Sequence, residues 1–596
     1  MLMCEKNYEK PKLNLRRVFW GRRDSFFTFY LDDYSDGTYG YSRLYFGTCA
    51  GMAAAAGRIK LFEIHVLYNG ETIPYSVNAD YAFLRINSLY GEIDFCIAEE
   101  NMLRIRGNSV SLMLTAEPIG HESAKPWDEK SFETDFGILG EKYLFVPIKG
   151  VIDTNAPYNY KSFGVQSVKI TAKATSNDRI FEIAVQRFLT NDVPRKTFES
   201  FETIPKKIYE NFNAWQKKLP IVPEKYQEMK EQSGYMIWSN VMHPRGSNGP
   251  QMVYVDRSHS AAAYAWQQSF QAMVHGRDIQ TAWGFLMSMF HFQDEAGQIP
   301  DYTNDYMSAY QSCKPPIQGF AINWLMNNCD MSNITKEQYE QLYEPLKKWT
   351  NWWFQFRDRN HDGLPAYDHG DESGGDDNTL FKKGIPLSSP DLAAFLILQM
   401  EVLGRIANML GKKEEEYWYN RSSLLMDKMI QQYWNGKQFI ARQGINMENV
   451  VESNAIQSYF PLILGKRLPK EIMDTMIEEL KRKKFITSYG IASEALDSPH
   501  LEFSYAWSRG TINAPNQLIM TIALADCGQK ELAEKLAQSY CKTVNKHGPN
   551  QHFNPFTGKP IDPFGFFQFQ NQVWTSWAAC VFLLLAGYYL PNERDN

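Results

Sequence analysis

Clustered basic charge is missing from this chain of 596 residues. Its 62 Lys and Arg are scattered along the sequence and are outnumbered by 68 Asp and Glu, which gives a formal net charge of -6. A protein that binds nucleic acid needs a basic patch or stripe that faces the phosphates. The charge distribution therefore gives no support for a nucleic-acid partner.

Paired cysteines are missing as well. The chain contains eight cysteines, and no two of them form a CxxC pair, so the ligand spacing of a structural zinc site is not present. We expect neither a bound metal nor another cofactor. We interpret the cysteines as dispersed, reduced thiols: Cys4, Cys49, Cys96, Cys313, Cys329, Cys527, Cys541 and Cys580.

Long apolar runs are absent too. No stretch of about 18 consecutive apolar residues occurs, so the sequence predicts no membrane-spanning segment and no membrane partner. The first residues become polar within a few positions and lack the apolar centre of a secretory signal. Together with reduced thiols, this leads us to expect a cytoplasmic protein. The sequence shows no heptad pattern and leaves the oligomeric state open.

The spacing of apolar residues differs between two regions of the chain. Alternation of polar and apolar residues in 58–68, 91–97 and 166–172 predicts β-strands separated by frequent turns. We therefore expect an N-terminal antiparallel β-sandwich over residues 1–200. A proline-punctuated linker with a charged helical stretch is expected over 201–225.

Helical periodicity dominates residues 226–596. No repeat of 30–45 residues is visible, so the sequence does not predict a solenoid. A ring of helical hairpins around a central cleft, with long loops as its floor, fits this pattern. The predicted helices cover 262–292, 316–328, 336–357, 391–410, 413–433, 454–465, 470–483, 513–526, 529–546 and 572–588.

The segment 371–378, Asp-Glu-Ser-Gly-Gly-Asp-Asp-Asn, holds four acids in eight residues. Carboxylates this dense raise each other's pKa by repulsion. Such a cluster serves either to bind a cation or to offer one protonated and one ionised carboxyl to a substrate, as glycoside hydrolysis requires. We favour an active-site role for 371–378.

The preceding segment, Asp358-x-Asn360-x-Asp362-Gly363, begins like a calcium-binding loop. The twelfth position, where such a loop needs a bidentate Glu, is His369. Since the most discriminating ligand is missing, a hydrogen-bonded turn is the favoured interpretation of 358–363, and calcium is the alternative.

Aromatic residues near polar motifs point to a sugar-binding cleft. Phe, Trp and Tyr make up 14% of the chain, and although most of them must fill a core, aromatic faces also cover the C–H patches of sugar rings. Polar, proline-rich loops near Trp266, Tyr302 and Lys314 precede predicted helices at similar spacing. A helical barrel would place such loops around one mouth.

Two further segments resemble loops of such a mouth. In 507–516, Arg509 lies two residues after Trp507 and could bind sugar hydroxyls or form a surface ion pair. In 550–558, Asn, Pro and Gly form a loop before the last helix, which Trp574 opens. Spacing alone predicts only a turn there.

Taken in order along essentially the whole chain, these motifs resemble the helical-barrel glycosidases of the clan that holds glycoside hydrolase family sixty-three and the trehalases of family thirty-seven. The family's Trp-Asp-x-x-Phe helix start is matched by 266–270, and its Gln-Pro-Pro loop by Lys314-Pro315-Pro316. Its Asp-Gly-Leu-Pro block, followed by Glu-Ser-Gly-x-Asp-Asn, is matched by 362–378. Its Trp-Arg-Gly block is matched by 507–510 with one residue inserted, and its Glu-x-x-x-Pro-x-Thr-Gly block by 551–558.

The resemblance implies an N-terminal β-sandwich, an (α/α)6 barrel and hydrolysis of an α-linked sugar with inversion. It makes Asp376 the general acid, with a pKa raised by the like charges of Asp371, Glu372 and Asp377. It places the general base in the last loop. The residues expected to line the subsite of the terminal sugar are Trp266, Gln267, Tyr302, Glu372, Arg509 and Trp574.

This chain departs from the family at the base position, which is occupied by Gln551. An amide cannot accept a proton from water, and no Asp or Glu lies between His547 and Lys559. Three explanations stay open: a Glu-to-Gln variant made to trap substrate, a base elsewhere at Glu494 or Glu502, or a catalytically silent homologue. Gln267 likewise stands where the family has an Asp.

The sequence thus predicts an inverting, exo-acting α-glycosidase, of the α-glucosidase type, that removes a terminal sugar from a small carbohydrate substrate. A silent carbohydrate-binding protein and an inverting phosphorylase are the alternatives. The phosphorylase would need basic phosphate ligands, for which Lys314 and Arg509 are the nearby candidates. The motifs specify neither the sugar nor the linkage.

Overall fold

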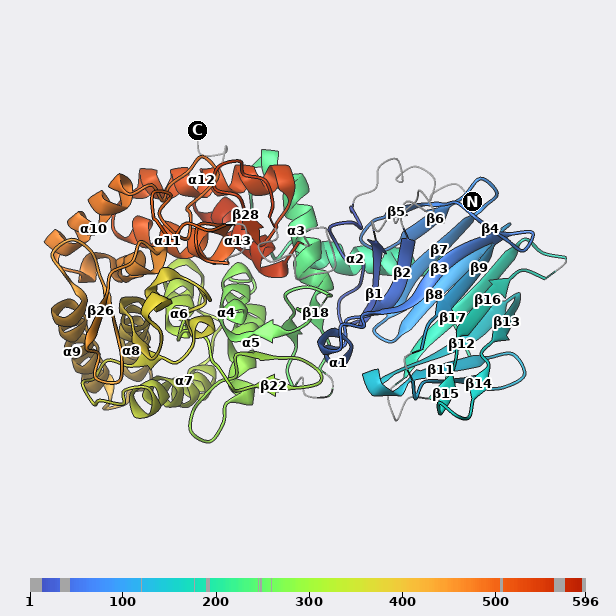
Figure 1. Ribbon diagram of the computed structural model, residues 1–596, viewed down its shortest axis with the longest axis horizontal. Coiled ribbons are helices and arrows are strands. Elements are labelled where there is room, and N and C mark those ends of the chain that lie inside the picture. Colours follow the sequence, from blue (N-terminus) through green and yellow to red (C-terminus); the bar gives the residue numbers. More distant parts are fainter. Residues whose placement is uncertain are drawn as a thin grey trace.

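A β-rich N-terminal region and a helical C-terminal region lie side by side in the computed structural model (Figure 1). This order of antiparallel strands and then helices confirms the prediction from the two hydrophobic periods. The structure describes residues 13–32, 43–118, 120–175, 177–188, 193–244, 246, 249–258, 260–503, 507–561 and 574–591.

Two antiparallel sheets make up the N-terminal region. The seven-stranded sheet has the order β1-β2-β3-β9-β16-β13, with β4 paired to β3. Its strands are β1 (Phe27–Asp32), β2 (Arg43–Thr48), β3 (Lys60–Tyr68), β4 (Glu71–Ile73), β9 (Ser111–Ala116), β13 (Val151–Asn155) and β16 (Val168–Lys173). The eight-stranded sheet has the order β10-β11-β12-β17-β8-β7-β6-β5. Its strands are β5 (Ser76–Ala79), β6 (Leu84–Asn87), β7 (Glu92–Glu99), β8 (Met102–Asn108), β10 (Ser123–Pro126), β11 (Phe132–Phe136), β12 (Glu141–Lys149) and β17 (Ile180–Phe188).

Aromatic side chains join the facing sides of the two sheets. The rings of Phe46 in β2 and Tyr143 in β12 have centroids 5.5 Å apart. Phe62 in β3 lies 5.8 Å from Phe145 in β12. Such edge-to-face pairs bury large apolar areas between two sheets, so the alternation seen in the sequence marks the inward faces.

Helix α2 (Ile204–Gln216) occupies the predicted linker and connects the two regions (Figure 1). Its apolar stripe includes Phe212, which is fully buried. The Phe212 ring lies 4.5 Å from Tyr81 in the β region and 5.5 Å from Trp238 in α3 (Gln227–Ser239). The charged helical stretch is therefore packed on both sides.

Six inner elements form a closed ring in the described part of the helical region. Each contacts the next, and the last contacts the first. In ring order they are α4 (Ala265–Val274), α6 (Gln318–Asn328), α8 (Pro390–Leu410), the 3-10 element η7 (Ile456–Arg467), α11 (Ala514–Asp526) and α13 (Ser576–Tyr588). The flanking helices are α3, α5 (Ile279–Ser288), α7 (Lys336–Phe356), α9 (Glu415–Tyr433), α10 (Lys470–Arg482) and α12 (Lys530–His547).

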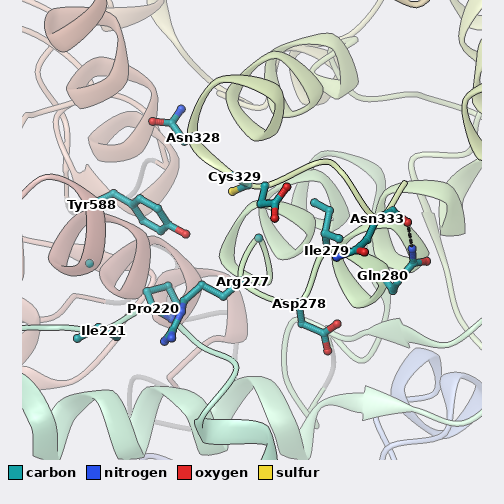
Figure 2. Close-up of a pocket in the computed structure, with 13 residues that line it drawn as sticks. Pro220, Ile221, Arg277, Asp278, Ile279, Gln280, Asn328, Cys329, Asn333 and Tyr588 are labelled. Atoms are coloured by element: carbon teal, nitrogen blue, oxygen red, sulfur yellow. Dashed lines mark hydrogen bonds between the residues drawn. The ribbon is translucent and has the colours of Figure 1, made fainter. Parts of the chain in front are cut away.

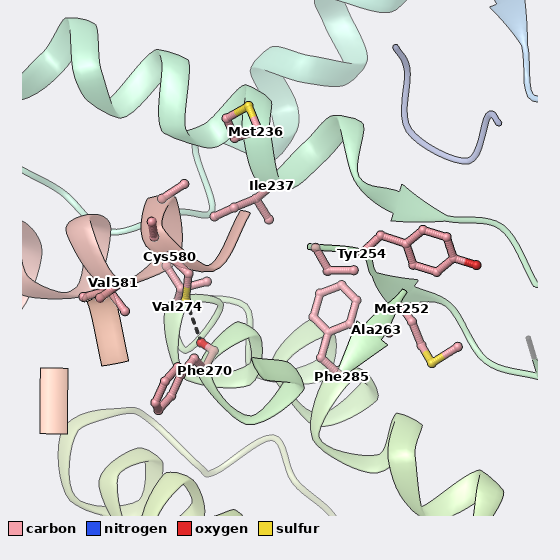
Figure 3. Packing of buried hydrophobic residues seen from close by; sticks show 14 of the residues in the cluster. Met236, Ile237, Met252, Tyr254, Ala263, Phe270, Val274, Phe285, Cys580 and Val581 are labelled. Carbon is pink, nitrogen blue, oxygen red and sulfur yellow. Dashed lines mark hydrogen bonds between the residues drawn. The ribbon is translucent and has the colours of Figure 1, made fainter. Parts of the chain in front are cut away.

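Apolar side chains from both layers fill the space between neighbouring helices. Figure 3 shows Phe270 and Val274 of α4 beside Cys580 and Val581 of α13. The Cys580 thiol donates to the Phe270 carbonyl oxygen at 3.0 Å. Among the described residues, α8 is the one helix long and apolar enough to cross a membrane, but 78% of its apolar window is buried in the protein, as expected of a core helix.

Two predicted helices differ from the observed elements. The stretch 262–292 is divided into α4 and α5 by a turn at Gly276, where a Cβ would lie 2.4 Å from the Cys329 sulfur. The stretch 454–465 is 3-10 rather than α, because Pro461 lacks an amide hydrogen and Gly465 has a φ of 55°. Positions 572–573 of the last predicted helix lie outside the described residues.

Arg257 ties the β region to the barrel. Its guanidinium is 1% exposed and donates to the carbonyl oxygens of Phe27 at 2.9 Å, Arg22 at 2.7 Å and Ser239 at 3.0 Å. Gly21 permits this approach, since a Cβ there would lie 2.4 Å from the guanidinium. Carbonyl groups from both regions therefore depend on one buried cation.

We expect Arg257→Met to lower the free energy of unfolding by at least about 3 kcal/mol, because several buried carbonyl groups lose a charged donor. Thermal and urea denaturation measure the change. The matched control is Arg195→Met, since Arg195 forms an exposed ion pair with Glu99 and its loss should leave stability unchanged. Equal transitions for the two variants would contradict the role given to Arg257.

Candidate active site

The inner helices begin at one end of the ring, where the loops and short strands before them meet. Strand β20 (Ala263–Tyr264) pairs with β21 (Tyr302–Thr303), and β27 (Ile512–Asn513) pairs with β28 (His552–Phe553). Asn550 bridges to Trp574 ahead of α13. The predicted convergence of these loops is confirmed.

The acidic loop 371–378 is anchored to the end of α7 by a buried ion pair. Arg357 donates to both carboxylate oxygens of Glu372, at 2.7 and 3.0 Å. The Asp368 amide adds a hydrogen bond of 2.7 Å to the same carboxylate. Glu372 is 1% exposed, so its carboxylate holds the loop and has little surface left for a ligand.

The turn before the loop is closed by its own side chains. An Asp358 carboxylate oxygen accepts from the Gly363 amide at 2.9 Å, and Asp362 accepts from the Leu364 amide at 2.8 Å. The hydrogen-bonded turn predicted for 358–363 is confirmed. No group of three or more His, Cys, Asp or Glu able to hold a metal occurs in the described part of the chain.

Glycines let the acidic loop press against its neighbours. Gly374 has a φ of 69°, and a Cβ there would lie 2.7 Å from the indole of Trp266 in α4. A Cβ at Gly375 would lie 2.1 Å from the amide of Gln457 in η7. A larger residue at Gly374 would strain the backbone and press on the indole, whereas one at Gly375 would have to move the end of the Gln457 side chain.

Burial is the main cause of the raised pKa of Asp376, which lies at about 6. The side chain is partly accessible to solvent, yet protein surrounds the carboxyl and penalises its charged form. The ammonium of Lys314 opposes the rise in pKa. The negative charges of Asp371, Asp301 and Asp377 add to it as smaller causes.

This ranking of causes corrects the expectation from the sequence. Repulsion within the loop was expected to raise the pKa of Asp376, but burial has the larger effect. Glu372 is not among the main causes of the shift, because its charge is compensated by Arg357. One of the carboxylates that do contribute, Asp301, comes from a different loop.

Lys314 is the cation next to these carboxylates. Its Nζ donates to the Asp371 carbonyl oxygen at 2.7 Å and lies 3.4 Å from an Asp301 carboxylate oxygen. Both Lys314 and Asp301 are buried. The sequence suggested Lys314 only as a phosphate ligand and did not indicate Asp301, although both belong to proline-punctuated loops of the predicted mouth.

Asp377 joins the acidic loop to the segment that holds Arg509. Its carboxylate accepts from the Ser508 amide at 2.7 Å and from the Trp507 amide at 3.3 Å. The Arg509 Nε lies 3.5 Å from the same group. Arg509 keeps 35% of its side chain exposed, so part of its guanidinium stays available for another acceptor.

Gln551 lies next to this segment through the β27–β28 pairing. Asn513 opposes His552, and the His552 ring lies 4.7 Å from Trp507. Gln551 is partly exposed. The loop that the resemblance assigns to the base therefore does reach the acidic loop, by way of Trp507 and Asp377.

His552 places a ring nitrogen beside Gln551 that has no partner among the described residues. Burial lowers the pKa of His552 to about 3, so the ring is neutral near pH 7. Its Nδ1 lies 3.2 Å from Thr511 Oγ1, whose own hydrogen goes to the Trp507 carbonyl. Nδ1 must then carry the proton, which leaves Nε2 as an acceptor. No pattern in the sequence pointed to this residue.

Several buried polar atoms at this end of the barrel lack a hydrogen-bond partner within the described ranges. Native structures leave few such atoms unless water or a ligand meets them. They are Gln267 Oε1, Gln457 Oε1, His552 Nε2, Trp574 Nε1 and Trp577 Nε1.

The predicted sugar-contact residues lie at different depths. Trp266, Gln267 and Trp574 are buried, and Gln267 is the deepest of the three. The Gln267 amide approaches Ser576 Oγ at 3.5 Å. Tyr302 is half-buried, with its ring 5.1 Å from Tyr264.

The two carboxylates considered as replacement bases have unlike surroundings. Glu494 is fully buried, and its oxygens accept from Thr379 at 2.8 Å and Ser498 at 2.6 Å. Glu502 is partly exposed, and its amide donates to the Arg509 carbonyl at 2.7 Å. Glu494 therefore belongs to the scaffold, whereas Glu502 lies beside Arg509.

We expect Glu372→Gln to lower the free energy of unfolding by about 3 kcal/mol, because it leaves the buried Arg357 with a weaker partner. It should also increase hydrogen exchange of amides in 368–378. The control is Glu99→Gln, which breaks an ion pair exposed on both sides. Unchanged exchange in Glu372→Gln would show that the pair does not anchor the loop.

Solved structures with a related fold include a bacterial glucoamylase complexed with acarbose. It is 11% identical, has a TM-score of 0.58 and covers 96% of this chain and 94% of its own. An uncharacterised conserved protein from Thermus thermophilus is 17% identical, with a TM-score of 0.50 over 60% of this chain and 98% of its own. The GH63 mannosylglycerate hydrolase from the same organism, in complex with Tris and D-glycerate, is 17% identical, with a TM-score of 0.47 over 54% and 93%.

A comparison with curated protein sequences finds no match. One family model matches residues 261–575, from just before α4 to the start of α13. This stretch is more than half of the chain and contains every loop described for the candidate site. The chain belongs to the family of mannosylglycerate hydrolase MGH1-like glycoside hydrolase domains.

Proposed function

We propose that this glycosidase is an inverting, exo-acting α-glycosidase that removes a terminal glucose- or mannose-type sugar from a small glycoside. The observation that carries the proposal is the raised pKa of Asp376, about 6, at the meeting point of the barrel loops. A carboxyl group with this pKa holds a proton at slightly acidic pH and can deliver it to a leaving oxygen.

Asp376 is the general acid in this proposal. It protonates the glycosidic oxygen while water attacks the anomeric carbon from the opposite face. Burial favours the protonated acid before the reaction, and Lys314 stabilises the carboxylate that remains after proton transfer. The two influences keep the pKa between that of a free carboxyl group and that of a fully buried one.

In this proposal the sugar is held by aromatic side chains and by polar atoms that have no partner among the residues the structure describes. Half-buried Tyr302 offers a ring face, and the buried indoles of Trp266 and Trp574 form the wall behind it. Gln267 Oε1 and the Trp574 Nε1 hydrogen are buried and have no partner among the described residues, so in this proposal the sugar enters deeply enough to meet them. Arg509 adds a partly exposed guanidinium. Glu372 acts indirectly, by holding the loop.

A residue other than Gln551 must act as the base, since an amide cannot accept the proton of water. Glu502 is the better candidate than Glu494, because it is partly exposed beside Arg509 while Glu494 is fully buried. In this arrangement Gln551 and the Nε2 atom of neutral His552 orient the attacking water or a sugar hydroxyl.

A catalytically silent carbohydrate-binding protein is the second candidate. The amide at Gln551 favours it, because a site that keeps its acid and its sugar contacts but lacks a base binds without turnover. The two candidates predict the same binding of sugar and opposite results in hydrolysis.

The domain boundaries are part of the same proposal. We assign residues 1–200 to a β-sandwich, 201–225 to a linker and 226–596 to a six-hairpin barrel. The closed ring of six inner elements and the packing of the two sheets support this division. We place the protein in the cytoplasm on the basis of its dispersed cysteines.

Asp376→Asn should lower kcat/KM for a scissile α-glycoside by about 100- to 10,000-fold, the usual contribution of a general acid. In the unchanged chain, kcat/KM should fall as pH rises above about 6, since the acid loses its proton there. A screen of nitrophenyl α-glucosides and α-mannosides measures both effects.

The matched control is Asp371→Asn in the same loop. The charge of Asp371 raises the pKa of Asp376, so this variant should stay active with its alkaline limb moved to lower pH. Full activity of Asp376→Asn would exclude the assigned acid.

Gln551→Glu and Glu502→Gln together decide where the base lies. If Glu502 is the base, Glu502→Gln loses about 100-fold or more in kcat/KM and Gln551→Glu brings little gain. If the base is simply missing, Gln551→Glu alone gains hydrolysis. No turnover in either variant or in the unchanged chain, with sugar binding retained by calorimetry, would reject the enzyme and favour the silent protein.

A further inference from the structure

A cavity lies at the end of the barrel where the inner helices finish. It has a volume of about 780 Å³ and is lined by the turn between α4 and α5, by the first residues of α5, by the ends of α6 and α13, and by Pro220 and Ile221 (Figure 2). The candidate active site uses the starts of the same helices. Since α4 alone spans about 15 Å, the two sites lie at opposite ends of the ring.

The helix ends make this cavity rich in hydrogen-bond acceptors. The last carbonyl groups of a helix have no intrahelical donor, and they carry partial negative charge. Asn328 closes α6 and Tyr588 closes α13 on the cavity wall. Asp278, Ile279 and Gln280 begin α5 on the same wall and add the first N–H groups of that helix. The wall therefore offers both acceptors and donors, as a ligand with several hydroxyl groups requires.

The charged side chains that line the cavity also favour a neutral ligand. Asp278 is held by Lys218 at 2.7 Å, and Asp330 also lines the cavity. Arg277 is the one Lys or Arg side chain among the lining residues, and its Nη1 donates to the Leu219 carbonyl at 2.9 Å. The lining therefore offers no cluster of cations for a phosphate or a carboxylate.

An apolar side completes the cavity. The Tyr588 ring packs edge-on against Trp324, with centroids 4.8 Å apart, which fixes its orientation. Ile221 is 55% exposed and lines the same cavity. An immobilised aromatic ring next to amides and carbonyl groups suits the two kinds of surface on a sugar, its C–H face and its hydroxyl edge.

We propose that this cavity is a second, non-catalytic binding site for a neutral carbohydrate of one or two sugar units. Its volume lies in the range of small-ligand sites. The hydroxyl groups donate to the helix-end carbonyls and to Asn328, and the sugar face covers Tyr588. The site does not depend on the chemistry proposed for Asp376.

Cys329 provides a reporter inside the cavity. It is the one cysteine of the described residues that is not fully buried, and it lines the wall between Asn328 and Asp330. A bound sugar should shield its sulfur from iodoacetamide. The rate of alkylation at Cys329, followed by peptide mass mapping of the full chain at one pH, therefore measures occupancy.

With glucose or maltose at about 100 mM, a site with a Kd of about 10 mM should slow alkylation of Cys329 about tenfold. Inorganic phosphate and spermidine, as anionic and cationic probes, should leave the rate unchanged. Asn328→Leu should abolish the protection, while Gln431→Leu, on the exposed face of α9, should keep it. Asp376→Asn should keep it too, which separates this site from the catalytic one.

Three results would overturn the proposal. They are no protection by either sugar, protection that persists in Asn328→Leu, and protection by phosphate or spermidine in place of sugar. The alkylation test does not measure hydrolysis. Its result therefore bears on the second site even if the proposed function is wrong.

Discussion

The buried ion pair between Arg357 and Glu372 is the constraint on which the candidate active site depends. It neutralises one acid of a crowded loop and fixes that loop to the end of α7. With the loop fixed, Gly374 can lie against Trp266 and Asp377 can accept from the 507–508 amides. Asp376 is then held among loops from several helix starts, where burial rather than repulsion raises its pKa.

The barrel gives its two ends different chemistry. At the helix starts, the described residues include buried polar atoms without partners, a protonatable carboxyl and a lysine. At the helix ends, carbonyl groups and amides line a cavity with a single basic side chain. The same helices therefore supply donors and charged groups at one end and acceptors at the other, because all peptide dipoles of a helix point the same way.

Much of the architecture could be predicted from local pattern. Alternation placed β3, β7 and β16, and helical spacing placed α7, α8, α9 and α12 to within a few residues. The pattern failed where local chemistry interrupts a helix, at Gly276 and at Pro461. An apolar run cannot reveal whether a glycine packs against a distant sulfur, so the division into α4 and α5 was not visible.

The sequence by itself determined which chemical groups the protein possesses. It contains a dense acidic loop with Asp376, and it has an amide, Gln551, at the position where the resemblance predicts a base. Only the tertiary structure decided the state of these groups. Glu372 is paired with Arg357 and is not among the main causes of the raised pKa of Asp376. Asp301 and Lys314, which lie outside the acidic loop, do affect that pKa. A pKa depends on burial and on distances of a few ångströms, and residues far apart in the chain acquire both only when it folds.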